Sequence, residues 1–169
     1  MRSVNGTLPP NKSENQKNDA ASSGFMLCSN CGECCRHTQM LLCRSDIKRI
    51  RGLGHSEKEF VHFDRKGFAR LKNRNGHCVF YLRKASRCDI YRHRPLGCRI
   101  YPVMADANGH TMVDDLCPMV HTVTEQEVKR KSQKLFPLLR SIDSEAVDRR
   151  RRLQNAPRSF DTRTANNLK

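Results

Sequence analysis

The sequence predicts a small, loop-rich α+β domain that is stabilised by metal, with a short β-hairpin and a helical C-terminal extension. Three observations lead to this fold class. Hydrophobic residues make up 37% of the 169 residues and the chain has no Trp, so the apolar core is sparse. The nine cysteines include a tight cluster, CSNCGECC, which random placement would not give. Helix and strand signals are short until a longer helical pattern begins after Cys117.

The chain is strongly basic, with 32 Lys and Arg against 17 Asp and Glu and a formal net charge of +15. No stretch approaches the roughly 20 apolar residues of a membrane-spanning helix, so no membrane segment is expected. The first residues lack the continuous apolar run of a secretory signal. We therefore expect a cytoplasmic protein, in which thiols stay reduced and an odd number of cysteines needs no disulfide partner.

Composition along the chain predicts four segments. The first residues are rich in Asn, Ser, Lys and Pro and contain no aromatic side chain, which is typical of disorder. The cysteines mark the folded unit, and the last residues again lack apolar pattern. We expect a disordered leader over 1–24, a cysteine-cluster metal-binding domain over 25–122, a basic helical extension over 123–156 and a disordered tail over 157–169.

Two short helices are expected after the first cysteine cluster. Ser45 is placed to cap a helix with the sequence DIKRIR, and Gly52 is placed to end it. Ser56 and Glu59 form a capping box for a second helix, EKEFVHF. The side chains expected to face the core are Ile47, Ile50, Phe60, Val61 and Phe63.

A β-hairpin is expected next. The segments GFARL and HCVFYL are separated by KNRNG, in which Asn75-Gly76 suits a tight turn. The stretch over 83–102 contains Pro95 and Gly97 and therefore predicts loops rather than a long helix. A short strand is expected over 111–113.

The segment after Cys117 is predicted to be helical. Thr124 and Glu127 form a second capping box. Pro137 is tolerated in the first turn of a helix but interrupts a helix in progress, so we expect one broken helix or a helical pair over 125–154. Apolar residues at helical spacing mark its inward face: Leu135, Leu139, Ile142, Ala146 and Leu153.

The first cysteine cluster carries the strongest functional signal. Cys28, Cys31 and Cys34 are separated by two residues each, a spacing that lets successive thiolates turn back onto one ion. Gly32 supplies the backbone freedom that such a loop needs. Cys34 and Cys35 are adjacent, so their side chains diverge and serve either different sites or two irons of one cluster.

The other cysteines are isolated along the chain. Cys43 lies in the apolar run MLLC and is better interpreted as a small buried hydrophobe than as a ligand. Histidines near the cysteines are more often surface residues, so they are left out of the ligand set. Eight cysteines then remain, enough for two four-thiolate sites. The candidate metal ligands are Cys28, Cys31, Cys34, Cys35, Cys78, Cys88, Cys98 and Cys117.

The expected cofactor is zinc or iron, the latter including a 4Fe-4S cluster. The spacing of Cys28, Cys31 and Cys34 matches the first three ligands of a ferredoxin-type loop, whose fourth ligand typically precedes Pro, as Cys117 does. Small thiolate domains in basic proteins are very often structural zinc sites. The spacing leaves both metals open.

Four motifs, in order, resemble the YkgJ-type cysteine-cluster family, a zinc- or iron-chelating domain with the pattern CxxCxxCC. They are the cluster at 28–35 followed by SDIKRI, then GHCVFYL, then CDIYRHRPLGCRIYP, then Cys117-Pro118, and they cover about residues 26–120. The resemblance implies that the eight cysteines bind metal or an iron–sulfur cluster. A related cluster occurs in flagellin lysine methylases, which are much longer, and this chain has no room for a separate methyl-donor domain.

The segment CDIYRHRPLGCRIYP places other groups near the cysteines. Tyr91 and Tyr101 can cover a metal site and exclude water. Arg92, Arg94 and Arg99 can place cations beside thiolates, which lowers the pKa of a thiol. The alternative is that these arginines are merely solvated.

A basic run, Arg149, Arg150, Arg151 and Arg152, lies near the end of the helical segment. Four consecutive arginines span most of a helix circumference, so they cannot all face the core. Such a run attracts nucleic acid or an acidic partner, and it equally suits a solvated helix.

No catalytic motif is recognisable, so the chain is not expected to be an enzyme by itself. The leading hypothesis is a metal-binding cysteine-cluster protein with an accessory or structural role. One alternative is a nucleic-acid- or ribosome-associated protein with structural zinc and a basic binding helix. The other is a component of a protein-modifying, methylase-like or redox enzyme that uses the cluster.

Overall fold

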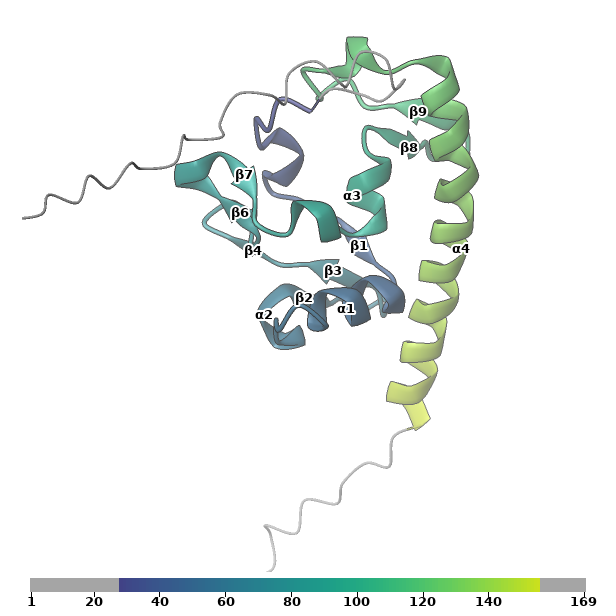
Figure 1. Ribbon diagram of the computed structural model, residues 1–169. Helices are drawn as coiled ribbons and strands as arrows, with labels where there is room; N and C mark the ends of the chain where they lie inside the picture. The colour runs from purple at the N-terminus through teal and green to yellow at the C-terminus, as the bar shows by residue number, and fades with distance from the viewer. Residues whose placement is uncertain (1–27, 156–169) are drawn as a thin grey trace, which may run out of the picture.

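Short antiparallel strand pairs, small helices and one long C-terminal helix make up the computed structural model, which describes residues 28–155 (Figure 1). The predicted α+β fold class is confirmed. The leader expected over 1–24 and the tail expected over 157–169 lie outside the described residues. Over 28–155 no helix combines the length and the apolar character needed to cross a membrane.

The largest sheet has three strands in the order β1-β3-β2, all antiparallel. They are β1 (Leu41–Leu42), β2 (Val61–Phe63) and β3 (Ala69–Leu71). Helices α1 (Arg44–Arg51) and α2 (Glu57–Phe60) lie between β1 and β2 in the sequence. Together with residues of the segment over 78–90 they form the first core cluster, whose buried members are Leu42, Ile47, Ile50, Phe60, Val61, Ala69, Leu71, Cys78, Phe80 and Ile90.

Helix α1 begins two residues earlier than predicted, and its N-cap is Cys43 rather than Ser45. Cys43 and Asp46 form a capping box, in which the side chain of each accepts from the other's backbone N–H. The Cys43 thiol also donates to Asp46 Oδ2 at 3.2 Å. Cys43 is buried, as expected, but it is a capping residue as well as an apolar one. Gly52 follows the last helical residue, as predicted.

Helix α2 is shorter than predicted. The capping box of Ser56 and Glu59 is confirmed, but the helix ends at Phe60 and the next three residues form β2. Residues 61–63 form a strand rather than a further helical turn because pairing with β3 satisfies their backbone groups, and because Val and Phe favour extended structure. The prediction that Phe63 faces the core is wrong, since 46% of this side chain is exposed.

The predicted turn at Asn75-Gly76 is confirmed, but the predicted hairpin arms are not. Both turn residues have positive φ, 52° and 77°, and they join β4 (Asn73–Arg74) to β5 (His77–Cys78). The segment GFARL cannot pair with HCVFYL because β3 already has a neighbour on each edge. Instead β6 (Tyr81–Leu82) pairs with β7 (Arg87–Cys88).

The stretch over 83–102 contains no long helix, as predicted. Its regular elements are η2 (Arg83–Ala85), β7, η3 (Tyr91–His93) and α3 (Leu96–Ile100). The strand expected over 111–113 is confirmed as β9 (Thr111–Val113), which pairs with β8 (Val103–Ala105). The remaining short helices are η1 (Glu33–Cys35) and η4 (Val120–Thr122).

Helix α4 (Glu125–Asn155) is continuous, so the predicted break at Pro137 is wrong. Leu135 and Leu138 flank Pro137 and are buried, and Ile142 and Ala146 continue the same face. This packing holds the helix together even though Pro removes one backbone hydrogen bond. At the start, the Glu127 N–H donates to Thr124 Oγ1 at 3.2 Å, as the capping box requires. The inward face differs from the prediction at its end, where 75% of Leu153 is exposed.

The long helix lies along one side of the other elements, next to α3 and β8 (Figure 1). It forms the second core cluster with them, and the buried members are Cys43, Ile100, Val103, Leu135, Leu138 and Ile142. A buried carboxylate ties α4 to α1, because Glu145 accepts from the Arg44 backbone N–H at 2.9 and 3.1 Å. The same carboxylate forms an ion pair with Arg149 at 2.8 Å.

Candidate metal centre

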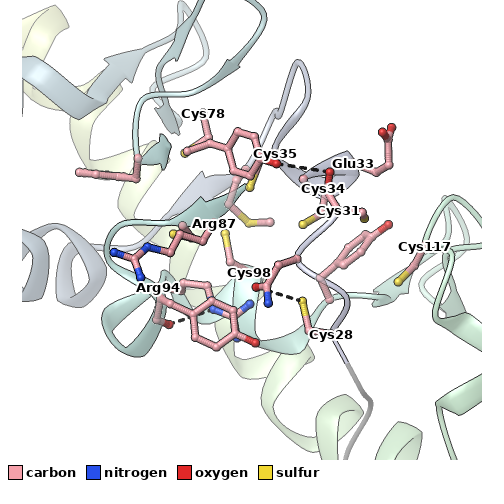
Figure 2. Close-up of a pocket in the computed structure, with 18 of the residues that line it drawn as sticks. Cys28, Cys31, Glu33, Cys34, Cys35, Cys78, Arg87, Arg94, Cys98 and Cys117 are labelled. Atoms are coloured by element: carbon pink, nitrogen blue, oxygen red, sulfur yellow. Dashed lines mark hydrogen bonds between the residues drawn. The ribbon is translucent and has the colours of Figure 1, made fainter. Parts of the chain in front are cut away.

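All eight predicted ligand cysteines line one pocket of about 80 Å³ (Figure 2). They come from the loop that contains η1, from β5 and β7, from α3, and from the segment after β9. Cys43 is the one cysteine that does not line the pocket, and it lies at the start of α1. The fold therefore gathers thiols that are up to 89 residues apart in the sequence. Their role as metal ligands stays a prediction.

The loop before β1 closes the pocket on one side. Cys28, Cys31 and Cys34 are exposed on it, and Cys35 is half-buried. Gly32 has φ +83°, and a Cβ placed there would come within 2.4 Å of the Tyr81 ring. The backbone freedom expected of Gly32 is therefore used for both a left-handed turn and a close approach to an aromatic ring.

The opposite side of the pocket is held by buried hydrogen bonds. Cys98 lies on α3, and the first residue of α3, Leu96, donates its N–H to Asp46 Oδ1 at 2.9 Å. Asp46 is fully buried and also forms an ion pair with Arg49. Arg49 in turn donates to the Arg94 carbonyl oxygen at 2.9 Å. Helix α1 thus fixes the start of the short helix that carries Cys98.

Cys34 and Cys35 interact although they are adjacent. A hydrogen bond from the Cys35 thiol lowers the pKa of Cys34 to about 7, and the nearby Arg94 guanidinium acts in the same direction against the effect of burial. The same hydrogen bond, followed by burial, raises the pKa of Cys35 well above its ordinary value. Cys34 is therefore the member of this pair that ionises first.

A first group of thiols surrounds Cys35. Charges on Cys34, Cys78 and Cys88 all act to raise the pKa of Cys35, and all four side chains line the pocket. Burial raises the pKa of Cys78 to about 11. Burial, followed by repulsion from Cys78 and Cys34, also raises the pKa of Cys98. These thiols are protonated in the metal-free chain at neutral pH.

A second group lies toward Cys117. Burial raises the pKa of Cys117, and the thiols that repel a charge on it are Cys31, Cys34 and Cys28. Figure 2 shows Cys117 at one side of the pocket, apart from Cys78 and Cys98. A charge on Cys34 raises the pKa of Cys98 in the first group and of Cys117 in the second, so Cys34 interacts with both groups.

The donor set fits a thiophilic metal. Eight thiols line the pocket, no histidine does, and Glu33 is the one carboxylate among the described lining residues. Zinc and iron are the metals that such thiolate-rich sites bind. As the side chains stand over 28–155, no three His, Cys, Asp or Glu groups converge closely enough to bind one ion.

Aromatic and cationic side chains complete the wall. All three tyrosines of the chain line the pocket, including Tyr91 and Tyr101 as expected and Tyr81, which sequence reasoning missed. Arg94 also lines it and stacks 3.8 Å above the centre of the Tyr91 ring. Arg87 was missed as well, because its position depends on the pairing of β6 with β7. Of the other arginines expected here, Arg92 and Arg99 do not line this pocket.

The four arginines of the predicted basic run, 149–152, differ in their contacts with the rest of the fold. Arg149 donates to the Gly67 carbonyl oxygen at 2.9 Å, pairs with Glu145 and lies over the Phe63 ring at 5.4 Å. Arg149 therefore joins α4 to the turn before β3. The next three residues, 150–152, are exposed.

Comparison with known proteins agrees with this donor set. The model of the family CxxCxxCC, described as "Putative zinc- or iron-chelating domain", matches residues 27–133, well over half of the chain. The chain is also similar to "Uncharacterized protein MJ0661" of Methanocaldococcus jannaschii, with 32% identity over 80 residues, or 44% of this chain and 43% of that protein. The matched region thus spans less than half of that relative's length. No solved structure matches.

Proposed function

Since the chain belongs to the CxxCxxCC family of zinc- or iron-chelating domains, we propose that the eight pocket cysteines hold the metal and that its role is structural or accessory. One observation carries the proposal: eight cysteines from distant segments line a single pocket, while the ninth caps a helix elsewhere. A sparse apolar core gives such a site a structural purpose, because thiolate–metal bonds can link segments that hydrophobic burial alone holds weakly.

The two groups of thiols support two four-thiolate sites. The first would use Cys35, Cys78, Cys88 and Cys98, because charges on Cys78 and Cys88 act on both Cys35 and Cys98. The second would use the remaining four: Cys28, Cys31, Cys34 and Cys117. This division places the adjacent Cys34 and Cys35 in different sites, so metal binding would break the hydrogen bond that joins their thiols in the metal-free chain.

Binding requires movement of the exposed loop. The described thiols do not converge as they stand, and the most exposed of them belong to the loop before β1. We expect metal to draw Cys28 and Cys31 inward onto the more buried groups. Bound zinc would supply a structural cross-link, and bound iron–sulfur would supply a redox centre. The free state of all nine cysteines supports function in a reducing compartment such as the cytoplasm.

The metal and its amount can be measured together. The protein is purified without oxygen, its zinc and iron are quantified, and its visible spectrum is recorded, since an iron–sulfur cluster absorbs visible light and zinc does not. Two sites predict that Cys98→Ser and Cys31→Ser each lose about half of the bound metal, and that the double variant loses nearly all of it. A single site predicts complete loss in each single variant.

The matched control is Cys43→Ala, which removes a thiol outside the pocket. This variant should keep the full metal content, although it loses a helix cap and about 1 kcal/mol of stability. Loss of metal equal to that of Cys31→Ser would contradict the ligand assignment.

A second proposal concerns the exposed arginines at the end of α4. Residues 150–152 are exposed where the helix extends past α1, and we propose that they attract nucleic acid through its phosphates (Figure 1). Replacing all three with Gln should weaken binding of single-stranded RNA and flatten its dependence on salt, with metal content unchanged. Parallel salt series for parent and variant would show instead that these arginines are only solvated.

A further inference from the structure

A second hollow, of about 430 Å³, adjoins the cysteine pocket between α3 and the first turns of α4. This volume lies in the range of about 300–1,000 Å³ that is usual for small-molecule sites. Five cations line it, namely Arg94, Arg99, Arg130, Lys131 and Lys134. The one carboxylate among its described lining residues is Glu127. The hollow therefore carries four more positive than negative side chains.

The sequence of α4 places these charges on one face. Glu127, Arg130, Lys131 and Lys134 are spaced at intervals of three and four residues, so they follow each other along the side of the helix that faces α3. Arg99 faces them from α3. Clustering like charges costs free energy in the unliganded chain, and a bound anion would relieve that cost.

An ion pair in the hollow fixes one cation in place. Lys131 lies 2.9 Å from Glu127 and also donates to the Tyr101 carbonyl oxygen at 3.1 Å, and only 11% of its side chain is exposed. Arg99 and Lys134 are exposed, and neither pairs with a carboxylate among residues 28–155. The hollow thus contains one lysine that is fixed by its contacts, Lys131, and two exposed cations that pair with no described carboxylate, Arg99 and Lys134.

The hollow is continuous with the cysteine pocket. Cys28, Cys98, Tyr91, Tyr101 and Arg94 line both. A molecule in the hollow would therefore touch two of the candidate metal ligands. The aromatic rings and the side chains of two aliphatic residues of α3 give the hollow an apolar wall beside its cations.

We propose that this hollow binds a small organic dianion, a phosphate monoester or a dicarboxylate, next to the candidate metal centre. Arginine presents paired N–H groups that match two oxygens of a phosphate or carboxylate, and such charge-assisted hydrogen bonds are about twice as strong as neutral ones. The proposal goes beyond metal binding, because the cations that carry it are not candidate metal ligands. The competing explanation is that the cations only balance the charge of the thiolates.

The test is calorimetric titration of the full chain at low salt. The probes are glycerol 3-phosphate and succinate, which represent the two sources of the oxyanion, and singly charged acetate at equal ionic strength. We expect saturable binding of one or both dianions at least about tenfold tighter than acetate, because each added charge-assisted hydrogen bond contributes about 1.5–3 kcal/mol. The better probe identifies the ligand class. Absence of saturable binding of both dianions would overturn the proposal.

The test variant is Arg99→Gln with Lys134→Gln, and the control is Arg83→Gln with Lys84→Gln, which removes the same charge from exposed residues of η2 that do not line the hollow. The test variant should bind the dianion at least about tenfold more weakly, while the control stays within about twofold of the parent. Equal weakening in both variants would show non-specific attraction and would contradict the site.

Metal content separates this proposal from the competing explanation. Zinc and iron are quantified in both variants and in the parent. If the cations only balance the thiolates, the test variant loses metal and the parent binds no dianion. If the hollow is an oxyanion site, the test variant keeps its metal and loses the dianion.

Discussion

Gly32 shows how one residue shapes the candidate metal centre. Its φ of +83° lies in the left-handed region, and its missing Cβ leaves room for the Tyr81 ring. The Tyr81 hydroxyl donates to the Cys31 carbonyl oxygen at 3.4 Å, so the ring and the loop are joined at this point. The position of Cys31 and Cys34 around the pocket therefore depends on a residue that has no side chain.

Gly32→Ala should lower both stability and metal content. The new Cβ brings backbone strain and a collision with Tyr81, so we expect a loss of about 2–4 kcal/mol and displacement of the cysteine loop. The matched control is Gly54→Ala, because Gly54 has φ +94° but a Cβ added there would meet no atom within 4 Å. The control should lose only about 1–2 kcal/mol and keep its metal. Chemical denaturation and metal analysis measure both effects, and equal metal loss in the two variants would refute the role of the close approach.

At the scale of elements, buried carboxylates join helices that are distant in sequence. Asp46 of α1 accepts from the first N–H of α3, and Glu145 of α4 accepts from the first N–H of α1. Each carboxylate lies where the positive end of a helix dipole meets it. The chain thus holds α1, α3 and α4 together with polar contacts that complement two small apolar clusters.

Asp46→Ala should destabilise the protein by about 2–4 kcal/mol, because it leaves the Leu96 N–H and the Arg49 guanidinium without their buried partner. Asp148→Ala is the control, since Asp148 forms an exposed pair with Arg44 at 3.5 Å. Exposed pairs contribute about 0–1 kcal/mol, so the control should differ little from the parent. Urea denaturation of both variants provides the comparison, and similar midpoints would contradict the structural role of Asp46.

Pro137→Ala should stabilise the protein. Proline within a helix destabilises the protein by about 3 kcal/mol. Replacing it with Ala also gives the unfolded chain more conformational freedom, which offsets up to about 1 kcal/mol of the gain. We therefore expect a net stabilisation of about 1–3 kcal/mol. Pro137 is exposed, so Ala leaves no cavity. A higher thermal midpoint with unchanged metal content is the expected result. A lower midpoint would indicate that the helix is broken at Pro137 after all.

At the scale of the whole molecule, metal removal should unfold residues 26–120. Structural zinc supplies about 10–16 kcal/mol of apparent binding free energy, which is comparable to the total stability of a small domain. Helix α4 packs on α3 and β8 of this region and would lose that support, so chelation under reducing conditions should abolish most of the circular dichroism signal. An unchanged spectrum and melting temperature in verified metal-free protein would show that the fold does not depend on metal.

Metal affinity should rise with pH. Burial raises the pKa of Cys78 to about 11 and also raises that of Cys88, so these thiols are protonated at neutral pH and must lose their protons to bind metal. Each displaced proton makes affinity increase about tenfold per pH unit. Competition with a chromogenic chelator at pH 6, 7 and 8 measures the slope. Affinity that does not change over this range would contradict thiolate ligation by these residues.

Local patterns predicted local structure, and distant pairing decided the rest. The Asn75-Gly76 turn and the Ser56–Glu59 capping box depend on a few neighbouring residues, and both are confirmed. The strand at Val61 depends on β3, and the continuity of α4 at Pro137 depends on burial against α3 and β8. These partners cannot be identified from spacing within one segment.

The candidate site shows the same division. The sequence separated the eight pocket cysteines from Cys43, and the structure places them accordingly. The sequence did not identify Cys43 as a helix cap, because thiols rarely occupy this position. It also did not identify the cation-lined hollow between α3 and α4. The hollow forms only where α3 and α4 pack together, and no single sequence motif predicts that packing.

The positions of the tyrosines make intrinsic fluorescence a probe of the cysteine pocket. The chain has three Tyr and no Trp, and Tyr81, Tyr91 and Tyr101 all line the cysteine pocket. Ultraviolet emission excited near 280 nm, about where tyrosine absorbs, thus arises entirely beside the candidate ligands. An iron–sulfur chromophore there would quench this emission by energy transfer, whereas colourless zinc would leave it bright. The unlabelled protein can therefore signal which of the two metals it carries.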